Sequence, residues 1–371
     1  MLSSLRERKL VAVLVVAILL AAMLVSYVLF SPRADTVKIC VIMPLTGPYA
    51  YMTEVKDTLL MAVDELNEWG GLNNHPIELV IADCESNGTV AAGEFERLER
   101  EVHPLAYISV TSHTTAAIMP LAEEAEVVVL GIAVASADIA PDSDWFFRYY
   151  TTTRVEAETV GGMIERLGIS SLGVLYTADE YGDSYASLLS EHMVGSGGTV
   201  ELAPTDYSDF DFSTEIAGLS GNDAIITLGP RENMMAMLSQ VRESGYEGHV
   251  LSGSGASVPT VSSLPEVEDV YMPAPLFYSP TNIPASEFVA NFHEVFAYSP
   301  THIGASGYDG MQLIWGLLTD REVSRDYLRT ALEQGFVFNG VMGGMRVAQG
   351  CHDVSFPLFP AVIRGGELWY L

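Results

Sequence analysis

The strongest constraint on the fold is an alternation of strand-like and helix-like segments along most of the chain. Residues 37–43 form a continuous apolar run with β-branched side chains, which is typical of a strand buried in a parallel sheet. Apolar residues at helical spacing then predict a helix that Thr53 can cap and that Gly70 and Gly71 can end. Strands that alternate with helices predict an α/β protein with parallel sheets and right-handed crossovers.

The alternation falls into two blocks, and the second begins after Thr151. In the first block, further strands are expected over 77–82, 105–110 and 127–130, and helices over 90–101 and 115–126. Pro120 either kinks the second of these helices or is its true first residue. In the second block, strands are expected over 172–176, 199–202, 224–228 and 249–251, and helices over 154–167, 184–194, 213–219 and 231–244.

The last hundred residues follow a different pattern. A stretch rich in proline and tyrosine, 270–284, shows no clear periodicity. Helices are then expected over 285–297, 303–318 and 323–334, followed by glycine-rich strands near 336–348 and 358–371. Such a tail can complete both sheets by crossing back between the two blocks.

Composition narrows the class of protein. The chain of 371 residues is long enough for two domains with full cores. Its net charge is −30, from 18 basic and 48 acidic residues, so nothing would neutralise phosphates and no nucleic-acid partner is expected. We interpret the acidity as a source of solubility, also in a salty medium. Metal binding would need carboxylates at ligand spacing, and no such loop is found, so neither a metal nor a cofactor is expected.

The odd number and irregular spacing of the three cysteines, Cys40, Cys84 and Cys351, exclude a disulfide framework. Cys40 lies inside an apolar run and is expected to be a small buried residue. A single bridge between Cys84 and Cys351 remains an alternative.

The N-terminal segment predicts where the protein is located in the cell. Residues 10–30 form an uncharged apolar run of 21 residues behind Arg6, Arg8 and Lys9, about long enough to cross a bilayer. The basic flank should stay in the cytoplasm, so residues 1–35 are expected to anchor the protein in the cell membrane with the remaining chain outside. A cleaved signal peptide is the alternative, although its apolar core is usually shorter. An outside location would allow glycosylation at Asn87, in Asn-Gly-Thr.

Several short motifs stand in a particular order along the chain. They are 43–50 (MPLTGPYA), 62–67 (AVDELN), 70–72 (GGL), 120–125 (PLAEEA), 181–182 (YG), 211–213 (DFS), 244–246 (SGY) and 307–309 (GYD). In this order and spacing the chain after residue 36 resembles the type I periplasmic solute-binding proteins, in the leucine/isoleucine/valine-binding branch that serves ABC importers.

The resemblance implies two doubly wound lobes that close around a ligand by bending at three hinge crossings near residues 151, 277 and 355. It assigns residues 36–151 and 278–355 to lobe 1, and residues 152–277 and 356–371 to lobe 2.

The physical case for a ligand site is strongest at residues 111–115 (TSHTT), which follow an expected strand and open an expected helix. Ligands of open α/β sheets bind beyond the carboxyl ends of strands, and free amides at a helix N-terminus attract a carboxylate. Ser112 and Thr114 can donate hydroxyls, although plain helix capping would use the same residues. His113 is either a ligand contact or a polar packing residue, and its charge is expected to change near about pH 6 to 7.

The resemblance adds a second loop, 131–136 (GIAVAS), to this wall. Ala133 matches a residue that offers a backbone contact in the family. Ala135 falls where the family has a threonine, and only Ser136 beside it carries a hydroxyl.

Three tyrosines are further candidates. Tyr181 matches a family tyrosine at the edge of the cleft, and packing on the next helix turn is the alternative. Tyr49 and Tyr51 can stack on a ligand or close the rim of the cleft, and exposure without a role is the alternative.

The main departure from the family is Ser254, which stands where the amino-acid binders carry an acid for the ligand ammonium. A buried ammonium needs a compensating charge, so this loss argues against a free α-amino acid and for an amide, a carboxylate or a polar analogue. Arg231 replaces a family aromatic; it can pair with a carboxylate or merely begin its helix.

No catalytic constellation stands in the sequence: the nucleophile elbow, the phosphate loop and the paired-histidine metal motif are absent. We therefore expect a binding protein rather than an enzyme. It would deliver a small polar solute (an amino acid, an amide or a carboxylate-like molecule) to an ABC permease. The alternatives are a membrane-anchored sensor of the same fold and a scaffold that binds no solute.

Overall fold

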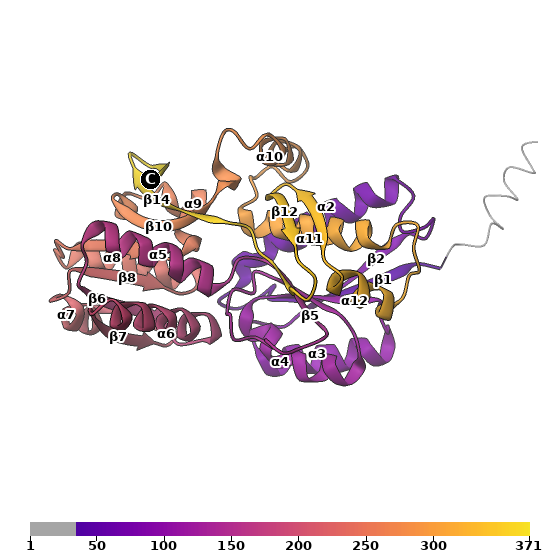
Figure 1. Cartoon of the computed structure of the whole chain (residues 1–371), viewed down its shortest axis with the longest axis horizontal. Coiled ribbons are helices and arrows are strands. Elements are labelled where there is room, and N and C mark those ends of the chain that lie inside the picture. Colours follow the sequence, from indigo (N-terminus) through magenta and orange to yellow (C-terminus); the bar gives the residue numbers. More distant parts are fainter. Residues whose placement is uncertain (1–34) are drawn as a thin grey trace, which may run out of the picture.

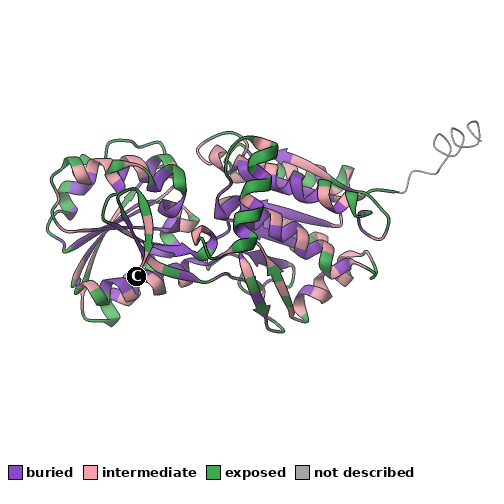
Figure 2. Ribbon diagram, turned by 90° about the horizontal axis from the view of Figure 1, so that it is seen from above, coloured by how far each residue is buried: buried purple, intermediate pink, exposed green. Residues whose placement is uncertain are grey.

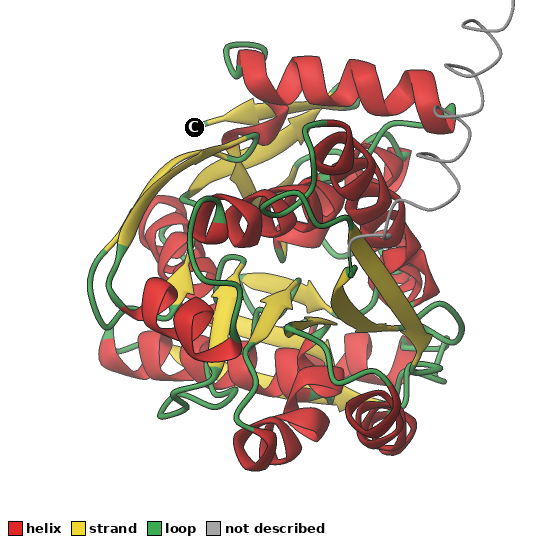
Figure 3. Ribbon diagram, turned by 90° about the vertical axis from the view of Figure 1, so that its right-hand side faces the viewer, coloured by secondary structure: helices red, strands yellow, loops and turns green. Residues whose placement is uncertain are grey.

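The computed structural model describes residues 35–371, which form two α/β lobes side by side (Figure 1). Each lobe is built on its own sheet. The first sheet has the order β13-β5-β4-β3-β1-β2, and the second has the order β15-β14-β10-β9-β8-β6-β7. Helices lie above and below the strands of the first lobe (Figure 3), as the alternation of strands and helices predicts.

All strands of the first sheet are parallel. They are β1 (Val37–Met43), β2 (Ile77–Asp83), β3 (Ala106–Val110), β4 (Val129–Ile132), β5 (Phe146–Tyr149) and β13 (Asp353–Val354). The helices of the first lobe are η1 (Ala50–Thr53), α2 (Glu54–Glu68), α3 (Gly88–Glu101), α4 (Ser112–Ala125), α10 (Ile283–Phe296), α11 (His302–Leu318) and α12 (Arg325–Glu333). A hairpin of β11 (Phe336–Gly340) and β12 (Gly343–Val347) follows α12.

The second sheet is parallel except at one edge, where β14 and β15 run antiparallel. Its strands are β6 (Ser171–Thr177), β7 (Thr199–Thr205), β8 (Ala224–Leu228), β9 (His249–Ser252), β10 (Val270–Pro275), β14 (Leu358–Arg364) and β15 (Glu367–Tyr370). The helices are α5 (Thr153–Leu167), α6 (Glu180–Gly195), α7 (Ser213–Leu219) and α8 (Arg231–Glu243), with short turns η2 (Ser254–Ser257), α9 (Pro259–Ser262), η3 (Pro265–Val267) and η4 (Leu276–Tyr278).

Burial on both faces explains the continuous apolar strands. In β1, Ile39 and Val41 face one apolar core, whereas Cys40 and Ile42 face another on the opposite side of the sheet. The second sheet likewise lies between two cores. Figure 2 shows the buried strands at the centre of both lobes and the exposed outer faces of the helices around them.

The chain passes between the two sheets at three places: from β5 to α5, from β10 to α10, and from β13 to β14. His302, at the start of α11, receives contacts from all three passages. Its Nε2 lies 3.1 Å from the Tyr150 hydroxyl and its Nδ1 lies 2.9 Å from the Tyr278 hydroxyl. The Phe356 ring, in the third passage, packs edge-on against His302 and Tyr150.

Three strands were not expected, namely β5, β10 and β13, and β13 has only two residues. β10 carries Pro273 and Pro275, which have no amide hydrogen to donate, so its sequence does not predict a strand. It pairs with β9 only at Val270 and Tyr271, and its prolines face the antiparallel neighbour β14. β5 has only four residues and offers too little sequence for a period.

Helix ends show one confirmed prediction, one correction and one excluded alternative. Gly70 and Gly71, with φ of +103° and +70°, follow the end of α2 as expected. The expected cap by Thr53 is wrong, because its hydroxyl donates to the Ala50 carbonyl in the preceding turn. Pro120 lies inside α4, which begins at Ser112, so it is not the first residue of that helix.

The expected membrane anchor, residues 10–30, lies outside the described residues. Within residues 35–371, each helix is too short or too polar to cross a bilayer. The three cysteines are free thiols, and buried Cys84 lies 3.3 Å from the Thr114 hydroxyl, so the alternative bridge to Cys351 is not formed. The exposed side chain of Asn87 accepts hydrogen bonds from two backbone amides and caps α3.

Candidate ligand-binding site

A cleft lies between the lobes, at the carboxyl ends of strands from both sheets. The order β2-β1-β3-β4 in the first lobe and β7-β6-β8-β9 in the second reverses direction beside the first strand of each lobe. The loops after those strands therefore diverge, and ligands of such sheets bind in the crevice that they leave. The cleft contains about 670 Å³ free of protein atoms, a volume that includes space open to solvent.

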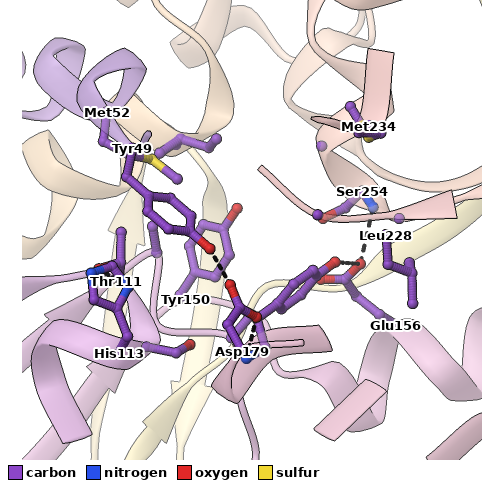
Figure 4. A pocket seen from close by; sticks show the side chains of 18 of the residues that line it. Tyr49, Met52, Thr111, His113, Tyr150, Glu156, Asp179, Leu228, Met234 and Ser254 are labelled. Carbon is purple, nitrogen blue, oxygen red and sulfur yellow. Dashed lines mark hydrogen bonds between the residues drawn. The ribbon is translucent and has the colours of Figure 1, made fainter. Parts of the chain in front are cut away.

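Both lobes and the first crossing contribute to the walls of the cleft (Figure 4). The first lobe contributes Tyr49, Tyr51, Met52, Thr111, Ser112, His113, Ala133, Ala135 and Ile303. The second lobe contributes Glu156, Asp179, Tyr181, Leu228, Gly229, Met234, Gly253, Ser254 and Gly255, and Tyr150 lies at the first crossing.

Most of the predicted site residues lie together in these walls. They are Tyr49, Tyr51, Ser112, His113, Ala133, Ala135, Tyr181 and Ser254. Thr114, Ser136 and Arg231 are not among the lining residues. Instead, the Thr114 hydroxyl accepts a hydrogen bond of 3.0 Å from Thr111, and the Ser136 amide donates to the Ser112 hydroxyl at 3.1 Å. Arg231 stacks on the Tyr51 ring, with its guanidinium carbon 4.5 Å from the ring centre.

The N-terminus of α4 opens on the cleft without a side-chain cap. Thr111 holds the N-cap position but its side chain accepts no hydrogen bond from the first turn. Thr111 has a φ of +77° and Ala133, after the neighbouring strand β4, has a φ of +53°. Residues other than glycine rarely adopt such backbone angles, and they concentrate at ligand sites. The first amides of α4 and the Ser112 hydroxyl can therefore serve a carboxylate or carbonyl group of a ligand.

His113 packs against Tyr49, with their ring centres 4.8 Å apart. Its Nδ1 lies 3.2 Å from the Thr111 hydroxyl. Burial lowers the pKa of His113 to about 4, because the charged form loses its water. The expected change of charge near pH 6 to 7 is therefore wrong, and the imidazole is neutral in that range.

Two acids on the wall of the second lobe were not among the predicted site residues. Glu156 lies in the first turn of α5 and is 1% exposed. Its Oε2 accepts hydrogen bonds from the Ser254 amide at 2.9 Å and from the Tyr181 hydroxyl at 3.2 Å. Burial raises the pKa of Glu156 to about 7, and these hydrogen bonds only partly oppose the rise.

Asp179 is the second acid, and it caps α6. Its Oδ1 accepts from the amides of Tyr181 and Gly182 at 3.0 and 2.8 Å, and its Oδ2 accepts from the Tyr49 hydroxyl of the other lobe. Burial raises the pKa of Asp179. The sequence holds a signal for this residue, because Asp179 lies two residues after the end of β6, at the position where the crevice is expected.

Gly253 allows the close packing around Glu156. A Cβ at this position would lie 2.6 Å from the Tyr181 hydroxyl oxygen and 3.4 Å from Glu156 Oε2. Only a residue without a side chain lets the loop after β9 approach these two groups.

Two α/β lobes with three chain crossings and a pocket at their facing strand ends define a clam-shell binding protein. Over residues 36–367 the chain matches the family model described as periplasmic binding protein. It belongs to that family.

Similar proteins are known by sequence and by structure. The leucine-, isoleucine-, valine-, threonine- and alanine-binding protein of Pseudomonas aeruginosa is 23% identical over 253 residues, which are 66% of this chain and 68% of that protein. The Leu/Ile/Val-binding protein homolog 8 of Brucella abortus is 26% identical over 247 residues, which are 62% of this chain and 60% of that protein.

The branched-chain amino acid transporter substrate-binding protein of Streptococcus pneumoniae, solved with isoleucine, superposes with a TM-score of 0.80 at 20% identity. That match covers 90% of this chain and 98% of the other. The fold is therefore shared at low sequence identity.

Proposed function

We propose that this protein captures a small polar solute between its lobes, outside the cytoplasm, and delivers it to an ABC importer. The observation that carries the proposal is a cleft whose two walls belong to different lobes and offer different chemistry. The uncapped N-terminus of α4 and Ser112 lie on one wall, and Glu156 and Asp179 lie on the other. A solute that bridges the walls would favour the closed arrangement of the lobes.

The composition of the walls limits the solute to a small molecule with polar ends. Apolar side chains contribute to both walls: Met52 and Ile303 from the first lobe, and Leu228 and Met234 from the second. A carboxylate or carbonyl group at Ser112 and a compact apolar body fit this arrangement. The names of the Pseudomonas and Streptococcus relatives, which bind branched-chain amino acids, support the same class of solute.

We further propose that the protein is held at the cell membrane and catalyses no reaction. Residues 10–30 would hold the protein at the cell membrane, with the lobes outside. The relatives are named as binding proteins, and we propose that this chain likewise binds its solute without converting it.

A thermal-shift screen tests the proposed function. The full-length protein, purified in mild detergent, is heated with amino acids, amides, carboxylates and nucleobases. A solute at a hundredfold excess over its Kd should stabilise the fold by about 2.7 kcal/mol, which is readily detected. Stabilisation by at least one class supports the proposal. A flat response to all classes would contradict it and favour a scaffold that binds no solute.

A further inference from the structure

His302 joins all three chain crossings at one buried point of the first lobe. Tyr150 belongs to the first crossing, Tyr278 to the second and Phe356 to the third. The buried imidazole of His302 lies 3.1 Å from the Tyr150 hydroxyl and 2.9 Å from the Tyr278 hydroxyl. The Phe356 ring stands edge-on to it, with ring centres 6.3 Å apart. Because lobes that close by hinge bending absorb the motion in their crossings, any rotation of one lobe against the other acts on these contacts.

The start of α11 fixes His302 to the first lobe. Thr301, directly before His302, caps α11, and its amide and hydroxyl donate to the buried carboxylate of Glu54 at 3.0 and 2.5 Å. Glu54 is the first residue of α2, and a Cβ at Gly304 would lie only 3.1 Å from Thr58 on that helix, so the two helices pack closely here. The imidazole therefore moves with the first lobe, whereas the two tyrosines that contact it stand on chain segments that lead into the second.

The hydrogen bonds around His302 have a definite direction. Burial lowers the pKa of His302 to about 3, so its ring is neutral at neutral pH and carries a single N–H. The Tyr278 hydroxyl accepts a hydrogen bond of 3.3 Å from the backbone amide of His302, so it donates its own proton to Nδ1. The ring proton then lies on Nε2 and is donated to the Tyr150 hydroxyl. The other tautomer would leave the Tyr278 proton without an acceptor among the described residues.

The Tyr150 end of this chain of hydrogen bonds opens on the cleft. Tyr150 lines the cleft (Figure 4), whereas His302 and Tyr278 do not. Its hydroxyl oxygen accepts from His302, and its proton has no acceptor among the described residues. We call Tyr278, His302 and Tyr150 together the hinge relay. It runs without a break from the second crossing, through the first lobe, to the first crossing and the wall of the cleft.

We propose that the hinge relay, which donates from Tyr278 through His302 to Tyr150, holds the crossings in their observed arrangement and so limits how easily the two lobes separate. A hydrogen bond weakens steeply beyond about 3.2 Å, so a shift of either hydroxyl by about 1 Å would break the relay. His302 is then a positioning residue that acts through the hinge. The inference rests on the lobe closure of the proposed function and adds the device that controls it.

Substitutions in the relay test the inference with and without a ligand. Tyr278→Phe removes a hydroxyl that lies outside the cleft, and His302→Phe removes both ring nitrogens but keeps an aromatic ring. Small-angle neutron scattering of the full-length protein, with the detergent contrast-matched, should give a larger radius of gyration for both variants than for the wild type. Calorimetry with L-isoleucine as the probe should show affinity about tenfold weaker, because the closed arrangement is less populated.

Tyr308→Phe is the matched control, since it removes a tyrosine hydroxyl from the same helix. That hydroxyl donates to Glu65 on α2 at 2.5 Å, so its hydrogen bond lies within the first lobe. The control should lower the melting temperature but leave the radius of gyration and the affinity unchanged. A second measurement uses the wild type alone: the long-range proton–nitrogen NMR spectrum of protein labelled with 15N-histidine should show His302 protonated at Nε2 and not at Nδ1.

Three results would overturn the inference. They are an unchanged radius of gyration in both relay variants, an equal increase in the Tyr308→Phe control, and a His302 ring that carries its proton on Nδ1. If solutes stabilise the wild type in the thermal-shift screen but the relay variants scatter like the wild type, only the inference fails. If no solute of any class stabilises the wild type, the proposed function itself fails, and the scattering still reports whether the relay holds the hinge.

Discussion

The hydroxyl of Tyr49 donates a hydrogen bond to Oδ2 of Asp179, and this bond joins the loop after β1 to the helix cap of α6 in the other lobe. A second contact between the lobes, Arg231 over Tyr51, lies beside it. The two contacts hold the lobes together where the cleft would otherwise open. Single substitutions at these contacts should therefore shift the equilibrium between open and closed lobes.

Tyr49→Phe should shift that balance toward the open form. The variant removes one hydrogen bond to a charged acceptor, worth about 1 to 3 kcal/mol, and keeps the ring that packs on His113. We expect a larger radius of gyration in small-angle scattering without ligand and a weaker ligand affinity. An unchanged radius together with unchanged affinity would show that the hydrogen bond does not contribute to closure.

Arg231→Leu tests whether this guanidinium binds the ligand or only joins the lobes. A cation over an aromatic ring contributes about 0.5 to 2 kcal/mol, so closure should weaken by that amount. Carboxylate and amide ligands of similar shape should lose the same factor in affinity, as measured by calorimetry. A loss restricted to carboxylates would instead place Arg231 in direct contact with the ligand.

Stability without ligand should depend on pH through Glu156. Its pKa is raised to about 7 in the folded protein, whereas glutamate in an unfolded chain titrates near about 4. Between these values the folded state binds one more proton, so the free energy of unfolding falls as pH rises through this window and levels off above it. Urea unfolding of wild type and Glu156→Gln over pH 4 to 8 checks this, and the variant should show a smaller fall.

Other titratable groups also change the free energy of unfolding in this pH range. The wild type must therefore be compared with Glu156→Gln. Asp309, bound by Tyr149 and two amides in the first lobe, has a pKa raised to about 6 by burial and adds its own slope. The titratable groups that face Glu156 are the hydroxyls of Tyr150, Tyr181 and Tyr185, whose pKa values burial holds above the window. Identical pH slopes in the two proteins would contradict the raised pKa of Glu156.

Gly253→Ala should disturb the surroundings of Glu156 without changing its charge. The new Cβ would meet the Tyr181 hydroxyl at 2.6 Å, so the tyrosine or the loop after β9 must shift. Overpacking of this kind costs about 1 to 3 kcal/mol of unfolding free energy. Gly255→Ala is the control, because its Cβ would come no closer than 3.9 Å to Met234. Equal melting temperatures for the two variants would argue against the tight packing at Gly253.

Much of the fold follows from local sequence patterns. Apolar runs, helical periodicity and glycine stops predict strands such as β1 and β8 and helices such as α7, because each pattern reports a preference of the residues themselves. β10 shows the limit of this reasoning. Its prolines contradict a strand locally, and most of it is a strand because it pairs with β14, a segment from the end of the chain.

The candidate site is harder to predict from the sequence, because its parts come together only in the folded protein. Residues at strand ends, such as Ser112 and Ala133, could be predicted from the general rule for open sheets. Glu156 could not, because its place in the wall of the cleft depends on contact with Ser254, 98 positions further along the chain. An acid in the first turn of a helix is ordinary in sequence, since it also favours the helix dipole.

Because the cleft is divided between two lobes, the proposed closure requires a molecule that contacts both lobes at once. The free amides of α4 and the Ser112 hydroxyl belong to the first lobe, and the acidic groups of Glu156 and Asp179 belong to the second. A molecule that contacts only one of these two sets engages one lobe and has little differential affinity for the closed state, so it shifts the equilibrium little. The closed shape would then report that both sets of groups are engaged, and a partner could recognise that shape without contacting the solute.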